Sequence, residues 1–265
     1  RAAGVTSVIG FGGGSSQDVA KLAALLLGSD ADLDRAWGVG QAKGPRLPLV
    51  LIPTTAGTGS EVTPVSIITV GAEEKRGVSS PVILPDMAIL DAELTLGLPA
   101  HITAATGIDA MVHAIEAYAS KNANNNPISK LLAREALRLA AVHALAYPIG
   151  GTFHIPHGLS NALVLPHVLR FNAPDAGTLY AEIAGDAFPH LAEIAGTQAR
   201  TAAFIDALAD LAKRVGLQTR LRDVDIPKSA IDKMAADAML QTRLLVNNPR
   251  EVTQDDARMI YTAAW

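Results

Sequence analysis

The sequence contains no cysteine, few aromatic residues (4% of 265 positions) and no long apolar run. Without cysteine it has neither disulfides nor thiolate metal sites, which fits a reducing, cytoplasmic location. Its apolar runs, such as LPLVLIP, are too short to cross a bilayer, and we expect no signal peptide. Basic runs are also absent and the net charge is −4, so neither a nucleic-acid nor a membrane partner is expected.

What the chain does contain is a change of pattern near residue 97. Up to that point, short apolar runs typical of buried strands alternate with helical spacing, which predicts an α/β layer with a mostly parallel sheet. We expect strands at residues 5–11, 48–53, 66–70 and 87–90, and a helix at 15–27. Ala- and Leu-rich helical patterns follow, so we predict an α/β domain over residues 1–97 and an all-helical domain over residues 98–265. The opening RAAGVTSVIGF predicts that further residues precede it in the natural protein.

Three glycines, Gly12 to Gly14, separate the first predicted strand from the first predicted helix. Glycines let an anion approach the backbone, and a helix N-terminus supplies N–H donors, so this layout is typical of a phosphate site. Ser15 and Asp18 have the spacing of a capping box. A plain tight turn explains the glycines alone equally well, and GGGS is not the GxGxxG fingerprint.

A second loop favours the phosphate site. PTTAGTGSEVT, residues 53–63, also follows a buried strand and also offers glycine and hydroxyl groups. Loops that follow two strands of one parallel sheet lie at the same edge of that sheet. We therefore expect the two loops to face one crevice that suits a diphosphate.

Histidines and a carboxylate gather in the helical part. In GIDAMVHAIEAY, Asp109 and His113 are spaced i, i+4 on one helix face. The opposite face, with Ile108, Val112 and Ile115, is predicted to pack in the core. An Asp–His pair is most often a structural hydrogen bond, but residues 142–158 add three further histidines, at positions 143, 154 and 157. Together they suit Zn²⁺ or Fe²⁺. For His101, His167 and His190 we expect ordinary surface or core roles.

Taken together, these motifs resemble the iron-containing (group III) alcohol dehydrogenase family. The resemblance covers the whole chain in ordered blocks, including GGGSSQDVAK, PTTAGTGSEVT, GIDAMVHAIEAY and HALAYPIGGTFHIPHG. It implies a Rossmann-like parallel-sheet nucleotide domain followed by an all-α metal-binding domain. It also implies a homodimer or larger homo-oligomer.

The resemblance assigns roles to individual residues. The residues implied to bind the NAD or NADP cofactor are Gly13, Gly14, Ser15, Asp18, Thr54, Thr55, Thr58 and Lys75. The implied ligands of Fe²⁺, with Zn²⁺ as the alternative ion, are Asp109, His113, His143 and His157. Tyr147 stands where many members have a histidine, so the resemblance implies for it a catalytic role in proton relay.

Two departures from the family pattern concern missing sequence. The family's opening strand–helix region, which separates NAD from NADP, is absent. His113 and His143 are closer in sequence than in the family, which predicts that a stretch is missing near residue 140.

The expected activity is metal-dependent hydride transfer between NAD(P) and a small alcohol, aldehyde or ketone. Two alternatives stay open. One is a metal-free reductase of the maleylacetate type, with the histidines binding a substrate carboxylate. The other is a truncated, non-catalytic form that keeps the fold and an oligomer interface.

Overall fold

The computed structural model describes residues 2–71, 74–137, 149, 153 and 155–265. It divides into two compact units, an N-terminal unit of residues 1–99 and a C-terminal unit of residues 100–265. The sequence predicts a division after residue 97, where the strand pattern ends. In the described part of the chain, no helix has the length and apolarity that a bilayer crossing requires.

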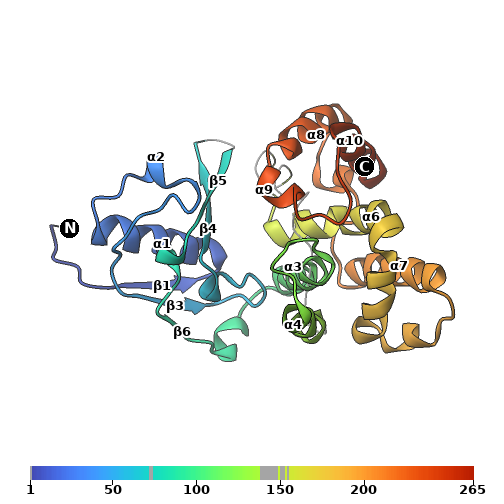
Figure 1. The fold of residues 1–265 in the computed structure, drawn as a ribbon, viewed down its shortest axis with the longest axis horizontal. Helices are drawn as coiled ribbons and strands as arrows, with labels where there is room; N and C mark the ends of the chain where they lie inside the picture. The colour runs from blue at the N-terminus through green and yellow to red at the C-terminus, as the bar shows by residue number, and fades with distance from the viewer. Residues whose placement is uncertain (1, 72–73, 138–148, 150–152, 154) are drawn as a thin grey trace. The chain divides into compact units, whose positions relative to one another are not determined.

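The N-terminal unit is an α/β layer (Figure 1). Its strands are β1 (Val8–Gly12), β2 (Gly38–Val39), β3 (Leu49–Pro53), β4 (Val65–Val70), β5 (Glu74–Ser79) and β6 (Met87–Ala88). Its α-helices are α1 (Gly14–Gly28) and α2 (Leu33–Ala36), and short 3₁₀ turns lie at η1 (Ser60–Val62), η2 (Pro81–Ile83) and η3 (Ala92–Thr95).

The sheet in the order β1–β3–β6 is parallel, as the sequence predicts. Gly12 pairs with Pro53 in its register, so β1 and β3 end at the same edge. Leu49 and Leu51 of β3 are fully buried against Ala20 and Ala24 of α1. Apolar side chains on a central strand and a covering helix thus fix the position of the glycine turn between β1 and α1.

The second sheet differs from the sequence prediction. It has the order β2–β5–β4, with β5 antiparallel to β4 and parallel to β2. Strand β5 has the sequence EKRGVS, whose charges and glycine give no apolar alternation, so the pattern did not predict it. The strand expected at residues 87–90 is limited to Met87–Ala88.

The described part of the C-terminal unit is helical. Its α-helices are α3 (Ala100–Ala119), α4 (Pro127–Leu137), α6 (His157–Ala187), α7 (Thr197–Arg214), α8 (Ile231–Met239), α9 (Thr242–Leu245) and α10 (Gln254–Ala264). Its 3₁₀ turns are η5 (Pro189–Glu193), η6 (Leu221–Val224) and η7 (Lys228–Ala230).

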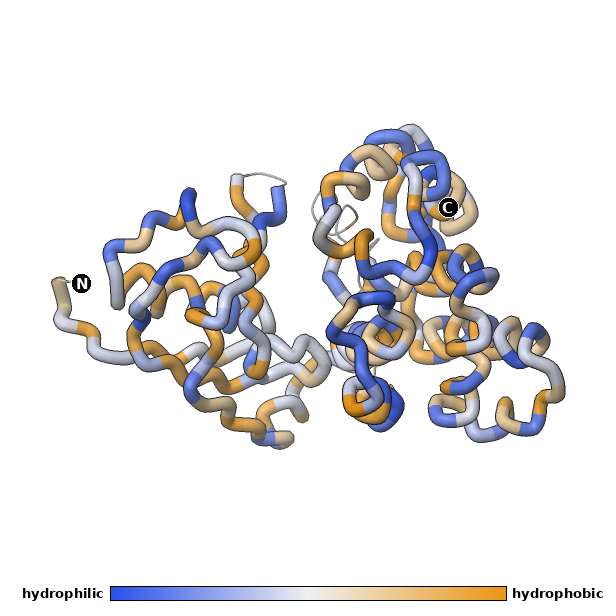
Figure 2. Tube along the Cα trace, viewed as in Figure 1, coloured by the Kyte–Doolittle hydropathy of each residue, from blue (hydrophilic) through white to orange (hydrophobic). Residues whose placement is uncertain are grey.

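Helix α6 belongs to both apolar clusters that the described residues of this unit form. One cluster joins α6 to α3, α4 and α7, and the other joins it to α8 and α10. Along these helices hydrophobic and hydrophilic stretches alternate (Figure 2), as expected where each helix buries one face. Ile108, Val112 and Ile115 are all buried, which confirms the predicted core face of α3.

Candidate functional site

The glycine turn leads into a helix whose first turn has no side-chain cap. Helix α1 begins at Gly14 with Gly13 as its N-cap, so Ser15 lies inside the helix and is exposed. The predicted capping box of Ser15 and Asp18 is therefore wrong, because the helix starts one residue before Ser15 and Asp18 bonds to other segments. The backbone N–H groups of an uncapped first turn are available to an anion.

The second loop lies directly beside this turn, as the sequence predicts. The Thr54 backbone N–H donates to the Gly12 carbonyl at 3.0 Å. A Cβ atom added to Gly14 would lie 3.1 Å from the Thr58 methyl carbon, and one added to Gly13 would lie 3.4 Å from that of Thr55. The space beside Gly14 is therefore tight for a side chain, whereas a Cβ atom at Gly13 would make an ordinary van der Waals contact. The Thr55 hydroxyl is buried and has no hydrogen-bond partner among the described residues, so a ligand can still use it.

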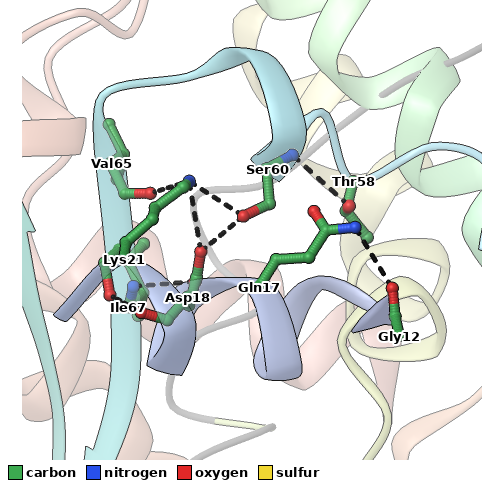
Figure 3. Close-up of polar contacts among 9 residues, drawn as sticks. Gly12, Gln17, Asp18, Lys21, Thr58, Ser60, Val65 and Ile67 are labelled. Carbon is green, nitrogen blue, oxygen red and sulfur yellow. Dashed lines mark hydrogen bonds and ion pairs between the residues drawn. The ribbon is translucent and has the colours of Figure 1, made fainter. Parts of the chain in front are cut away.

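Behind the turn, Asp18 and Lys21 of α1 connect three segments (Figure 3). The Asp18 carboxylate accepts hydrogen bonds from the Ser60 hydroxyl at 2.6 Å and from the Ile67 backbone N–H at 2.8 Å. Burial raises the pKa of Asp18, and these two donors together with Lys21 partly offset that rise. Both carboxylate oxygens have partners within the chain, and the contact of Asp18 with a cofactor stays a prediction.

Lys75 lies in the second sheet. It belongs to β5, opposite Thr69 of β4 in the antiparallel hairpin, and its side chain is half-buried. The predicted approach of Lys75 to the cofactor ribose stays a prediction.

In the C-terminal unit, Asp109 and His157 lie next to each other. Asp109 is 2% exposed, and His157 is the first residue of α6. The His157 Nε2 atom lies 3.8 Å from Asp109 Oδ1. The carboxylate thus faces the first turn of α6, whose positive end stabilises an anion.

Asn161 completes this contact, and sequence reasoning missed it. It is fully buried one turn after His157, and its side-chain amide donates a short hydrogen bond to Asp109 Oδ1. Its own carbonyl oxygen has no partner among the described residues. The i, i+4 spacing of His157 and Asn161 in HGLSN was the available signal, since it puts both side chains on one helix face.

A close helix contact holds these side chains together. Gly158 lies against α3, where an added Cβ atom would be 2.2 Å from the Ala105 carbonyl oxygen. No side chain fits there, so glycine allows the first turn of α6 to touch the backbone of α3. Gly158 thus brings the first turn of α6, with His157, close to α3, with Asp109.

The structure brings together only part of the predicted metal set. Asp109 and His157 are adjacent, and His113 lies one turn along α3 from Asp109 and is half-buried. Within the described ranges, no three histidine or carboxylate side chains are grouped closely enough to hold an ion. His143 and Tyr147, like the neighbouring His154, lie outside the described residues. A carboxylate beside an imidazole nitrogen nevertheless fits the donors that Fe²⁺ and Zn²⁺ accept.

The remaining histidines are not part of this arrangement. His101 and His190 are exposed. His167 is half-buried in α6, and burial, with a smaller contribution from Arg170, lowers its pKa to about 4. Its imidazole is therefore neutral at pH 7.

Both units match models of one protein family. The iron-containing alcohol dehydrogenase model matches residues 1–92. The model of the C-terminal part of the Fe-containing alcohol dehydrogenase family matches in two segments, residues 103–141 and 135–265. The chain belongs to the iron-containing alcohol dehydrogenase family and is an oxidoreductase by descent, as the motifs predicted.

Named relatives support this assignment. The long-chain-alcohol dehydrogenase 1 of Geobacillus thermodenitrificans is 38% identical over 97% of this chain and 74% of its own length. The lactaldehyde reductase of Escherichia coli is 32% identical over 99% of this chain and 78% of its own. This chain thus spans about three quarters of the length of these relatives. The alignment to the latter runs over 300 residues, against the 265 of this chain.

Solved structures agree with the fold. A 1,3-propanediol oxidoreductase superposes with a TM-score of 0.92 at 30% identity, covering all of this chain and 78% of that one. The sulfoacetaldehyde reductase of Bifidobacterium kashiwanohense, solved with NAD⁺, gives 0.81 at 30% identity, with 98% and 76% covered. These names favour the alcohol dehydrogenase prediction over the maleylacetate-reductase alternative.

Proposed function

We propose that the chain moves a hydride between a nicotinamide dinucleotide and a small alcohol, aldehyde or ketone. The observation that carries this proposal is how close Thr58 of the neighbouring loop lies to Gly14 at the uncapped start of α1: a Cβ atom added to Gly14 would be 3.1 Å from the Thr58 methyl carbon. Such a helix start offers N–H donors and positive potential to a diphosphate, and glycine leaves room for it.

In this proposal the two loops bind the cofactor. Gly13, Gly14 and Ser15 hold the diphosphate through the first turn of α1. The threonine loop, with Thr54, Thr55 and Thr58, runs along the diphosphate toward the nicotinamide. Asp18 supports the turn from behind and Lys75 approaches the ribose. NAD is the proposed dinucleotide, since a relative of 30% identity was solved with NAD⁺.

The proposed metal ligands are Asp109, His113, His143 and His157, and Fe²⁺ is the proposed ion. The buried carboxylate of Asp109 and Nε2 of His157 would hold it, while Asn161 fixes the carboxylate orientation. When bound, a divalent ion supplies Lewis-acid stabilisation of negative charge on the substrate oxygen. The Tyr147 phenol is the proposed group for moving a proton between substrate and solvent.

The substrate class is proposed from the relatives. Their names mention long-chain alcohols, lactaldehyde and 1,3-propanediol, which share a terminal hydroxyl or aldehyde group. We infer a primary alcohol or its aldehyde. Assays of primary alcohols of increasing carbon chain length with NAD⁺ show which chain length is oxidised fastest.

Three further expectations, on chain length, location and oligomeric state, belong to this proposal. The two-segment match of the C-terminal family model supports a missing stretch near residue 140. The absence of cysteine supports a cytoplasmic location. A homodimer or larger homo-oligomer, expected from the family resemblance, is measured by sedimentation.

Metal content and cofactor binding test the proposal together. The protein is purified anaerobically, loaded with Fe²⁺ and examined by elemental analysis, NAD⁺ titration and alcohol oxidation. We expect about one ion per chain, lost with the activity in Asp109→Ala but not in Asp210→Ala, which changes an exposed carboxylate on α7.

The alternatives give different results. If the wild type contains no metal and its activity persists after chelation, the metal proposal is contradicted and the metal-free reductase of the maleylacetate type is favoured. A folded chain that binds neither NAD⁺ nor metal is the non-catalytic form.

A further inference from the structure

Lys21 is a lysine with no exposed side-chain surface. It lies on α1, two turns after the glycine turn, and points toward the loop and strand that follow β3 (Figure 3). Burying an ammonium group without partners is strongly unfavourable. The cost of its burial must therefore be offset by the groups around it.

Those partners come from three segments. The Lys21 ammonium donates to the Val65 carbonyl of β4 at 2.6 Å and to the Ser60 hydroxyl of η1 at 2.9 Å. It also lies 3.5 Å from Asp18 Oδ1 on its own helix. Burial lowers the pKa of Lys21, and the Asp18 carboxylate opposes that shift. The pair thus joins α1 to η1 and to β4.

A short path leads from Lys21 to the threonine loop. Ser60 receives the Lys21 hydrogen bond, and its backbone N–H points to the Thr58 hydroxyl at 3.4 Å. Thr58 in turn lies beside Gly14, where the first turn of α1 begins and where an added Cβ atom would be 3.1 Å from the Thr58 methyl carbon. The lysine therefore holds the threonine loop at Ser60, and Thr58 of the same loop lies beside the uncapped start of α1.

We propose that Lys21 is a positioning residue for nucleotide binding: through Ser60 it fixes Thr58 beside Gly14 and so sets the affinity for the dinucleotide. This inference rests on the proposed binding of NAD between the glycine turn and the threonine loop. Lys21 itself does not touch the cofactor. A loop that is ordered before binding loses less conformational entropy on binding, so releasing it weakens affinity.

The test compares Lys21→Met, Ser60→Ala and Leu25→Ala. Methionine keeps the stem of Lys21 without its charge, and Ser60→Ala removes the hydroxyl but leaves the bond of Lys21 to Val65. Leu25→Ala is the matched control, since Leu25 is fully buried on the same helix in an apolar cluster that excludes the loop. Measured are the NAD⁺ dissociation constant, kcat, KM for NAD⁺ and the melting temperature.

In Lys21→Met and Ser60→Ala we expect the dissociation constant and KM for NAD⁺ to rise about tenfold while kcat stays within about twofold. Leu25→Ala lowers the melting temperature without changing either constant. The double variant of Lys21 and Ser60 binds NAD⁺ no more weakly than the worse single variant, because both act through one path.

Two results distinguish a failure of the positioning role from a failure of the proposed cofactor site. If Gly14→Val abolishes NAD⁺ binding but Ser60→Ala and Lys21→Met bind it as wild type does, the positioning role is wrong and the cofactor site stands. If Gly14→Val also binds NAD⁺ normally, the proposed cofactor site itself is wrong. Should Lys21→Met not fold, Ser60→Ala alone decides, since it keeps the buried lysine bonded to Val65 and Asp18.

Discussion

Two helices begin at candidate sites, and each has a glycine in its first turn. In α1 the glycine is Gly14, and an added Cβ atom would meet the side chain of Thr58 at 3.1 Å. In α6 it is Gly158, and an added Cβ atom would meet the Ala105 carbonyl oxygen at 2.2 Å. The first neighbour is a side chain that can shift slightly, whereas the second is the backbone of a packed helix. Gly158 is therefore required by the fold, and Gly14 by the ligand we propose.

The largest effect is expected for Gly158→Ala. The methyl group has no room, so α6 must move away from α3, and overpacking of this kind costs about 1–3 kcal/mol in the free energy of unfolding. The same movement separates His157 from Asp109 and lowers metal binding. Urea unfolding followed by circular dichroism measures the stability.

Gly107→Ala is the matched control, since Gly107 lies inside α3 with nothing within 4 Å of an added Cβ atom. Alanine there is expected to stabilise the helix by up to about 1 kcal/mol. Equal stability of the two variants would contradict the contact between Gly158 and Ala105.

The next effect is expected for Asn161→Ala. This change removes the amide that donates to buried Asp109, and loss of a hydrogen bond to a buried charge costs about 1–3 kcal/mol. Ser160→Ala is the control, because its buried hydroxyl donates, among the described residues, to the carbonyls of Ile155 and Pro156 just before its own helix. If both variants unfold at the same urea concentration, Asn161 has no special role at the carboxylate.

The sequence predicted local elements well and long-range partners poorly. The strands β1 and β3 were clear because apolar runs end at glycine or proline, and the contact of their two loops followed from the parallel order. Strand β5 was missed because EKRGVS is charged. Asp18 was predicted to cap its own helix, but its partners Ser60 and Ile67 lie more than 40 residues away in the chain. No local pattern contains that pairing.

The same limit applies to buried polar residues. A lysine in an amphipathic helix is normally exposed, and Lys21 is buried because the carbonyl of Val65, the hydroxyl of Ser60 and the carboxylate of Asp18 surround its ammonium group. Asp109 and His157 were paired through the family resemblance, while the burial of Asp109 comes from the packing of α6 against α3. Local spacing shows which residues share a face, and tertiary structure decides what that face meets.

A smaller effect is expected from His167 of α6, whose pKa is lowered to about 4. It makes the free energy of unfolding depend on pH. In the unfolded chain it titrates near 6.5. The unfolded state therefore binds more protons between these values, and the contribution of His167 to stability is lost as the pH falls from about 6.5 to about 4. His167→Gln is expected to flatten this part of the curve, measured as the difference in unfolding free energy between variant and wild type. A parallel pair of curves would show that His167 does not contribute.

The smallest effect on stability is expected for Gly14→Ala, the counterpart of Gly158→Ala. Alanine is the better helix former by up to about 1 kcal/mol, and the 3.1 Å contact with Thr58 offsets part of that gain, so unfolding in urea should hardly change. The added methyl group nevertheless occupies space that a diphosphate would need beside the helix start. We therefore expect the NAD⁺ dissociation constant to rise roughly three- to tenfold, measured by titration. Stability that falls as far as in Gly158→Ala would mean that both glycines serve packing, and the contrast between the two helix starts would disappear.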